Sequence, residues 1–89
     1  TIVGAQAANE LLNISGIKAS FVLTEYNGKV YISSRSIDEI NVQLIMEALG
    51  GGGHLTIAGA QLEHYSIAEV KHMLQQTIDK MIEEGDIKV

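Results

Sequence analysis

The chain of 89 residues contains no cysteine, no proline and no tryptophan. Without cysteine it has no disulfide, no thiolate metal ligand and no cysteine nucleophile. Aromatic residues make up only 4% of the sequence and hydrophobic residues 46%, so we expect an aliphatic core of Ile, Val, Leu and Ala. No internal repeat or low-complexity linker divides the chain. Length and composition therefore predict one domain over residues 1–89.

Positive charge is also scarce, because 6 Lys and Arg residues stand against 11 Asp and Glu residues, for a net charge of −5. Duplex DNA is bound through many Lys and Arg side chains, so this balance argues against a non-specific duplex-DNA-binding protein. It leaves open a small anionic ligand in a local pocket. No apolar run approaches the roughly 20 residues that cross a bilayer, and the first residues lack the layout of a signal peptide. We expect these residues to be soluble and cytoplasmic.

The chain starts at Thr1 and at once enters an alanine-rich stretch, so we expect it to be a C-terminal fragment of a larger protein. Residues 2–13 carry good helix formers with apolar residues on one face, which predicts a first helix. Residues 18–25 and 29–34 favour strands, and Asn27-Gly28 between them suits the positive φ angles of a tight turn. These segments predict a β-hairpin.

A second helix is predicted to run into a glycine-rich segment. Apolar residues from Ile37 to Ile45 share one helical face, and either Ser36 or Asn41 is suited to cap its start. Gly50 can adopt the left-handed conformation that closes a helix.

The last part of the chain predicts a strand and a further helix. Residues 56–64 are short and mixed, with Gly59 indicating a close backbone approach. Ser66 and Glu69 form a capping box before a continuous apolar stripe, which predicts a helix that ends by Gly85. The expected fold class is α/β: a small mixed β-sheet with an antiparallel hairpin, packed by about three helices in a layered sandwich.

The run Gly50-Gly51-Gly52-Gly53-His54 is the feature that a plain globular domain has least reason to contain. Each glycine costs backbone entropy that a larger side chain would spare. Consecutive glycine N–H groups can turn toward an anion, and the histidine can donate a hydrogen bond or carry a positive charge. The run therefore predicts a phosphate-binding segment; the alternative is a flexible loop between a helix and a strand. Neither a Gly-x-Gly-x-x-Gly motif nor the Lys-Ser or Lys-Thr of a nucleotide-triphosphate loop is present.

Arg35 is the only arginine and stands at the end of a predicted strand, flanked by Ser33, Ser34 and Ser36. Its fork of donors suits a phosphate, to which the hydroxyl groups could add donors. The alternative is a surface arginine in a serine-rich turn. Proximity of Arg35 to the glycine run would decide between the two interpretations.

The sequence shows no self-contained catalytic centre. His54, His64 and His72 are not at a spacing that binds a metal from one element, and no cysteine or carboxylate pair completes a site. No Gly-x-Ser-x-Gly motif marks a nucleophile. We therefore expect neither a metal ligand set nor a catalytic residue within this chain.

Several motifs together resemble the signature of the DHH-associated domain, the C-terminal half of the DHH phosphoesterases. They are Arg35-Ser36, Asn41-Val42, Gly50-Gly51-Gly52-Gly53-His54 and Ala58-Gly59. The segments Ala19–Leu23 and Val42–Met46 are similar to one branch of that family. This branch is the bacterial membrane-anchored cyclic di-adenosine monophosphate (cyclic di-AMP) phosphodiesterases. The resemblance covers nearly the whole chain.

In this family, a domain named for its Asp-His-His motif binds two divalent metal ions, usually manganese, and the associated domain closes over it to hold the nucleotide. The resemblance therefore implies that manganese belongs to the missing metal-binding partner domain and that this chain binds no cofactor itself. It implies that the full-length protein is anchored in the bacterial cell membrane. The residues implied to bind substrate or phosphate are Arg35, Ser36, Gly50, Gly51, Gly52, Gly53 and His54.

The resulting hypothesis is the substrate-holding domain of a metal-dependent phosphodiesterase that hydrolyses cyclic di-AMP to linear pApA, using a metal-activated water from the partner domain. The expected partners are the cyclic or linear dinucleotide and the metal-binding domain, with no duplex DNA; a homodimer is left open. A second hypothesis is the substrate-binding domain of a DHH-type single-strand exonuclease or oligoribonuclease. A third is a non-catalytic interaction or dimerisation module in which the glycines act as a hinge.

Overall fold

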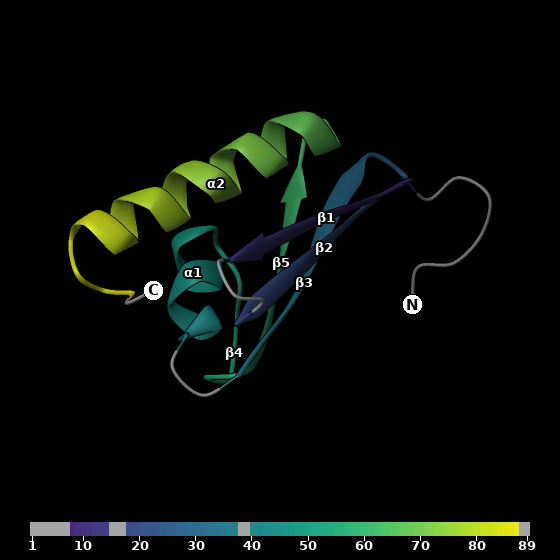
Figure 1. Cartoon of the computed structure of the whole chain (residues 1–89). Helices are drawn as coiled ribbons and strands as arrows, with labels where there is room; N and C mark the ends of the chain where they lie inside the picture. The colour runs from purple at the N-terminus through teal and green to yellow at the C-terminus, as the bar shows by residue number, and fades with distance from the viewer. Residues whose placement is uncertain (1–7, 15–17, 38–39, 88–89) are drawn as a thin grey trace.

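The computed structural model describes residues 8–14, 18–37 and 40–87 of the chain. A five-stranded sheet carries two helices on one face (Figure 1). In chain order the elements are β1 (Ala8–Ile14), β2 (Ala19–Tyr26), β3 (Lys29–Ser36), α1 (Val42–Ala48), β4 (Gly52–Gly53), β5 (Ile57–Glu63) and α2 (Ile67–Glu83). The α/β fold class that the sequence predicts is confirmed.

The strands lie in the order β1-β2-β3-β5-β4, and each pair of neighbours is antiparallel. The sheet formed by the described strands is therefore antiparallel where the sequence led us to expect a mixed one, because the chain reverses in the turn between β4 and β5. Both helices pack on the same face, so no described helix covers the opposite face (Figure 1). We call this opposite side the open face.

The hairpin of β2 and β3 forms as the sequence predicts. Asn27 and Gly28 occupy its turn with φ angles of 55° and 79°, the left-handed values that a type I′ turn requires at both positions. The turn fixes the register and places Val22 opposite Ser33. A shift of one residue would exchange the buried and exposed faces of a strand.

The core lies between the helices and the inner face of the sheet. Phe21 and Leu23 of β2 and Val30 of β3 are fully buried there. The described hydrophobic core consists of Ala19, Phe21, Leu23, Val30, Ile32, Ile40, Val42, Ile45, Met46, Ala58, Leu62, Val70, Leu74, Ile78 and Ile87. This composition confirms the predicted aliphatic interior.

Both predicted helix caps in the second half of the chain are present. The side chain of Asn41 caps α1 by accepting a hydrogen bond from the N–H of Leu44 at 3.2 Å, whereas Ser36, the other candidate, lies within β3. In the capping box of α2, the N–H of Glu69 donates to Ser66 Oγ at 3.1 Å and the N–H of Ser66 donates to Glu69 Oε1 at 2.8 Å. These side chains satisfy N–H groups that a helix start leaves unpaired.

The predicted first helix is wrong in its described part. Of residues 2–13, those from Ala8 onward form the edge strand β1, and residues 2–7 lie outside the described residues. β1 pairs with β2 along its whole length. Differences in helix propensity amount to at most about 0.7 kcal/mol for an ordinary residue, and tertiary pairing overrides them. The described helices therefore number two, and neither is long and apolar enough to cross a bilayer.

Candidate functional site

The open face brings together outward-facing residues from three neighbouring strands. On β3 these are Tyr31, Ser33 and Arg35, because side chains of a strand alternate between its two faces. Antiparallel pairing aligns each with one residue of β2 and one of β5. We name the rows after their β3 members: Ser20, Arg35 and Ile57 form the Arg35 row; Val22, Ser33 and Gly59 the Ser33 row; and Thr24, Tyr31 and Gln61 the Tyr31 row.

β4 extends two of these rows with residues of the glycine run. Gly52 lies opposite Gly59, at the end of the Ser33 row. The N–H of His54 donates to the carbonyl oxygen of Ile57 at 2.7 Å, so His54 stands at the end of the Arg35 row. Because adjacent strands lie about 4.8 Å apart, the backbones of His54 and Arg35 are separated by about 10 Å. Arg35 and His54 therefore lie in one row of the sheet, with the exposed side chain of Ile57 between them.

Two N–H groups of the glycine run close helix α1. The N–H of Gly50 donates to the carbonyl oxygen of Glu47 at 3.0 Å, and that of Gly51 donates to the carbonyl oxygen of Met46 at 2.7 Å. These bonds form a Schellman motif, in which Gly50 adopts the required left-handed conformation with a φ of 87°. The predicted closing role of Gly50 is confirmed, and the N–H groups of both glycines are already paired.

The N–H of Gly53 points away from the rest of the sheet. In an antiparallel pair of strands, hydrogen-bonded and non-hydrogen-bonded residue pairs alternate. Since His54 is bonded to Ile57, the next pair, Gly53 with Ala58, is a non-hydrogen-bonded one. The N–H of Gly53 thus faces the outer edge of β4, which ends the order of the described strands. This edge is where the glycine run can still donate to a ligand.

The glycine run also allows β4 to approach β5 closely. A Cβ atom added at Gly51 would lie 2.1 Å from the carbonyl oxygen of Gly59, and one added at Gly53 would lie 2.5 Å from the Cα of Ala58. Both positions therefore require glycine for packing. A Cβ atom at Gly52 would meet nothing within 4 Å, and its φ is not positive. Neither packing nor backbone conformation explains why residue 52 is a glycine.

Ser36 is turned away from its neighbour Arg35. Its hydroxyl group donates to the carbonyl oxygen of Ile40 at 2.6 Å, and its N–H donates to the carbonyl oxygen of Thr56 at 2.9 Å. These bonds join the end of β3 to the start of α1 and to the turn after His54. In this arrangement Ser36 holds the end of the site together, while Arg35 is the member of the pair that reaches the open face.

The side chain of Arg35 is exposed and has no hydrogen-bond or ion-pair partner among the described residues. Among these residues, nothing occupies the five N–H donors of its guanidinium group, which suit an external acceptor. Beside it, Gly59 and Gly52 present backbone without side chains at the end of the Ser33 row. The described open face thus combines an exposed cation with a bare strip of backbone, an arrangement that suits a phosphate and its attached sugar.

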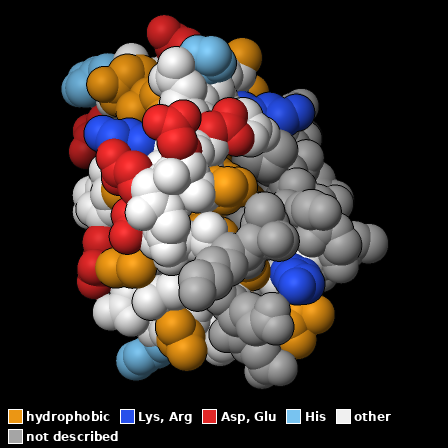
Figure 2. Space-filling view, turned by 60° about the vertical axis from the view of Figure 1, so that its left-hand side comes forward, with side chains coloured by type: hydrophobic (Ala, Val, Ile, Leu, Met, Phe, Trp, Pro, Cys, Tyr) orange, Lys and Arg blue, Asp and Glu red, His pale blue; other side chains and the backbone are white. Residues whose placement is uncertain are grey.

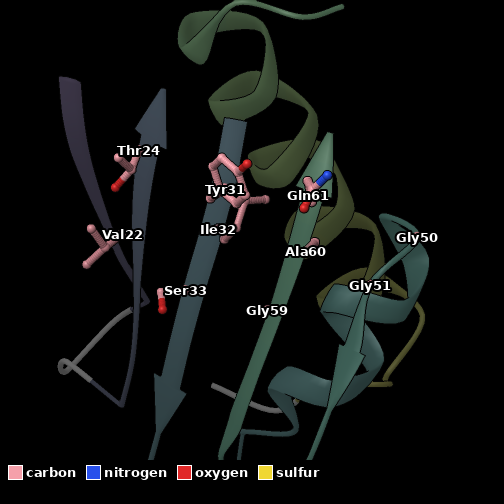
Figure 3. A pocket seen from close by; sticks show the side chains of 10 residues that line it. All are labelled: Val22, Thr24, Tyr31, Ile32, Ser33, Gly50, Gly51, Gly59, Ala60 and Gln61. Atoms are coloured by element: carbon pink, nitrogen blue, oxygen red, sulfur yellow. The ribbon is translucent and has the colours of Figure 1, made fainter. Parts of the chain in front are cut away.

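A hollow of about 790 Å³ lies on the open face beyond the Arg35 row (Figure 3). The Ser33 and Tyr31 rows form its floor, and Gly50 and Gly51 form its wall beyond β5. Figure 3 shows the side chains of Val22, Thr24 and Tyr31 on the same side of the sheet.

The sequence pointed to Ser33 as a neighbour of Arg35 but not to the other side chains of the hollow, among them Val22, Tyr31 and Gln61. The signal that would have found them is the alternation of side chains along the hairpin, because its register follows from the Asn27-Gly28 turn.

Residues 2–84 match the family model of the DHHA1 domain. The chain belongs to this family. It is 50% identical over 80 residues to the cyclic-di-AMP phosphodiesterase PdeA of Listeria monocytogenes and 49% identical over 82 residues to the cyclic-di-AMP phosphodiesterase GdpP of Bacillus subtilis. These matches cover 89% and 91% of this chain but only 12% of each relative. It is also 33% identical to the A-adding tRNA nucleotidyltransferase of Aquifex aeolicus over 67 residues, 74% of this chain and 8% of that protein.

These relatives confirm the resemblance inferred from the motifs around Arg35 and Gly50-Gly51-Gly52-Gly53-His54. Two of them are named as phosphodiesterases and are therefore hydrolases. This DHHA1 domain corresponds to one part of such a protein.

Charge is unevenly distributed over this DHHA1 domain. Acidic side chains gather on the helical side (Figure 2), where Glu69 and Asp79 of α2 are exposed. On the open face, Arg35 stands at one end, and Lys29 lies opposite Glu63 at the other. At its Arg35 end, the described open face therefore carries a positive charge that can attract a small anion.

Within the described part of this DHHA1 domain, no three His, Asp or Glu side chains are grouped to hold a metal ion. His64 and His72 are exposed and lie outside the rows that contain Arg35 and His54. What the site offers chemically is hydrogen-bond donors, positive charge and bare backbone for binding an anion.

Proposed function

We propose that this DHHA1 domain holds the phosphate end of an adenine dinucleotide for a metal-dependent phosphodiesterase that hydrolyses cyclic di-AMP to linear pApA. The observation that carries the proposal is that the exposed guanidinium group of Arg35 shares one face with His54, in its own row, and with the bare backbone of Gly52 and Gly59, in the adjacent Ser33 row. The names of relatives 49–50% identical to the chain support cyclic di-AMP as the substrate.

The task of the domain in this reaction is to position the substrate. Arg35 would donate two parallel hydrogen bonds to non-bridging phosphate oxygens, and the imidazole of His54, at the end of the same row, would add a donor. Because these groups stand on paired strands, they fix the phosphate relative to an attacking water and reduce the entropic part of the barrier.

Activation of that water is assigned to the partner domain. Two divalent ions, manganese in our expectation from the family resemblance, would be held there.

Gly52 supports the proposal because the domain itself has room for a side chain there. A side chain at this position would project over the strip of backbone beside Gly59. Without one, a sugar or phosphate can lie directly against the two strands.

The test is an amide NMR titration of the 89-residue chain with cyclic di-AMP, pApA and a short DNA oligonucleotide. We expect the largest shifts at Arg35, Gly52, Gly53 and His54, and a stronger response to the adenine dinucleotides than to DNA. An equal or stronger response to DNA would favour the single-strand exonuclease or oligoribonuclease hypothesis. No response to any of the three would favour an interaction or dimerisation module.

A further inference from the structure

We propose that the hollow on the open face is a nucleobase subsite, in which Gln61 recognises adenine and Tyr31 provides the surface against which the base lies. This inference rests on the proposed function, because Arg35 supplies the phosphate anchor. Arg35 follows Tyr31 by four positions along β3, a distance of about 13 Å at about 3.3 Å per residue. The Arg35 side chain spans part of this distance, and a ribose with its base spans the rest.

The carboxamide of Gln61 provides the chemistry that distinguishes the base. Gln61 is exposed on β5, and its side chain has no hydrogen-bond partner among the described residues. A carboxamide carries a donor and an acceptor in one plane, which match the N6 amino group and the N7 atom of adenine. Guanine is preferentially recognised by Arg or Lys, and the described residues that line the hollow include neither.

Tyr31 lies next to Gln61, because the two residues are directly opposite in the pairing of β3 with β5. Figure 3 shows both side chains rising from neighbouring strands on the same side of the sheet. An aromatic side chain offers any base a stacking surface, whereas the carboxamide beside it selects among bases. Val22, which is 39% exposed, adds an apolar surface to the floor.

The subsite is built on the central strands of the sheet. β3 is paired on both sides, with β2 and β5, and β5 is paired with β3 and β4. Their register therefore fixes the spacing between Tyr31, Gln61 and the phosphate anchor before a ligand arrives. A preformed site of this kind loses little conformational entropy on binding.

The experiment compares three probes on the unmodified 89-residue chain by amide NMR titration: ribose 5-phosphate, pApA and pGpG. Ribose 5-phosphate is expected to shift the signals of Arg35, Gly52 and Gly53 only. We expect pApA to shift those of Tyr31 and Gln61 as well. We also expect it to bind at least about fivefold more tightly than pGpG, which is the low end of the discrimination that a bidentate base contact gives.

Two pairs of variants sharpen this comparison. Gln61→Leu should lower the affinity for pApA about fivefold and leave the affinity for ribose 5-phosphate unchanged. Gln76→Leu, at an exposed position of α2, should change neither affinity. Tyr31→Ala should lower the affinity for pApA about fivefold. Tyr31→Phe should retain the affinity for pApA because the aromatic ring remains.

Two outcomes separate the inference from the proposed function. If pApA and pGpG bind equally while Arg35 and Gly53 still respond, the adenine subsite is overturned and the phosphate-binding proposal stands. If none of the three probes shifts Arg35 or the glycine run, the proposed function fails and the subsite fails with it. Because the first comparison uses the unmodified chain, a variant that folds poorly does not affect it.

Discussion

Strand β3 separates two surfaces with opposite roles. Its inner residues Val30 and Ile32 are buried against the helices, whereas its outer residues Ser33 and Arg35 are exposed on a face that carries no described helix. The side chains of the first pair contribute burial of apolar surface, and those of the second pair contribute polar groups available to a ligand. Stability and the proposed binding therefore depend on alternate positions of the same strand, so substitutions at adjacent residues can separate them.

The glycine run shows the same division over a shorter distance. Gly51 and Gly53 permit the close approach of β4 to β5, and Gly52 between them has open space where a side chain would lie. The first two are needed to form the sheet edge. Under the proposed function, the missing side chain of Gly52 leaves room for a ligand.

The largest contrast is expected between Phe21→Ala and Val22→Ala. Phe21 is fully buried and Val22 is 39% exposed on the opposite face of β2. Loss of the phenyl ring should lower the free energy of unfolding by about 3–5 kcal/mol, and the valine substitution by less than about 1 kcal/mol. Urea denaturation followed by circular dichroism measures both. Equal losses would show that the two faces are not distinct in their contribution to stability.

Gly51→Ala and Gly52→Ala test the division within the glycine run. The added methyl group at residue 51 clashes with backbone atoms of β5 and should lower the free energy of unfolding by about 1–3 kcal/mol. At residue 52 the change should stay within about 0.5 kcal/mol, while the affinity for pApA falls. Thermal unfolding and ligand titration of both variants are the measurements. Undiminished pApA binding by Gly52→Ala would show that the ligand does not contact this backbone.

Arg35→Ala should reduce the affinity for pApA about tenfold, or about 1.4 kcal/mol, because a charged hydrogen-bond donor to the phosphate is lost. Arg35→Lys should lie between the parent and Arg35→Ala, since lysine keeps the charge but not the fork. Lys80→Ala removes one positive charge from an exposed position of α2 and serves as the control. Calorimetric titration at two salt concentrations measures the effect, and equal losses for Arg35→Ala and Lys80→Ala would exclude a specific contact.

The smallest contrast is expected between the neighbouring residues Ser34 and Ser33. The buried hydroxyl group of Ser34 donates to the carbonyl oxygen of Ala58 at 2.6 Å, so Ser34→Ala should lower the free energy of unfolding by about 1 kcal/mol. Ser33→Ala, on the open face, should change it by less than about 0.5 kcal/mol. Chemical denaturation resolves this difference, and a larger loss at Ser33 would reverse the assignment of the two faces.

Local signals in the sequence predicted the elements that depend on a few adjacent residues. The Asn27-Gly28 turn and the Ser66–Glu69 capping box formed as expected, because each is defined by contacts within four residues. The strand β1 was predicted as a helix because its partner is β2, and pairing between separate segments is not visible in local propensity.

The candidate site was predicted only in part, because contacts between separate segments are not visible in local sequence patterns. The sequence singled out Arg35 and the glycine run, but it did not foresee that the N–H groups of Gly50 and Gly51 would close α1. Those bonds depend on where the helix ends. It also paired Ser36 with Arg35, whereas the pleat of β3 sends the two side chains to opposite faces.

The sequence by itself determined the aliphatic core, the hairpin register, the helix caps and the segments that carry the family's motifs. Each of these follows from residue types at short, fixed spacings. Only the tertiary structure decided that Arg35, Gly52 and His54 share one face, and that Tyr31 and Gln61 stand side by side in a hollow. These arrangements arise from the pairing of β5 with β3 and of β4 with β5, and hydrogen bonds between strands leave no local pattern in the chain that forms them.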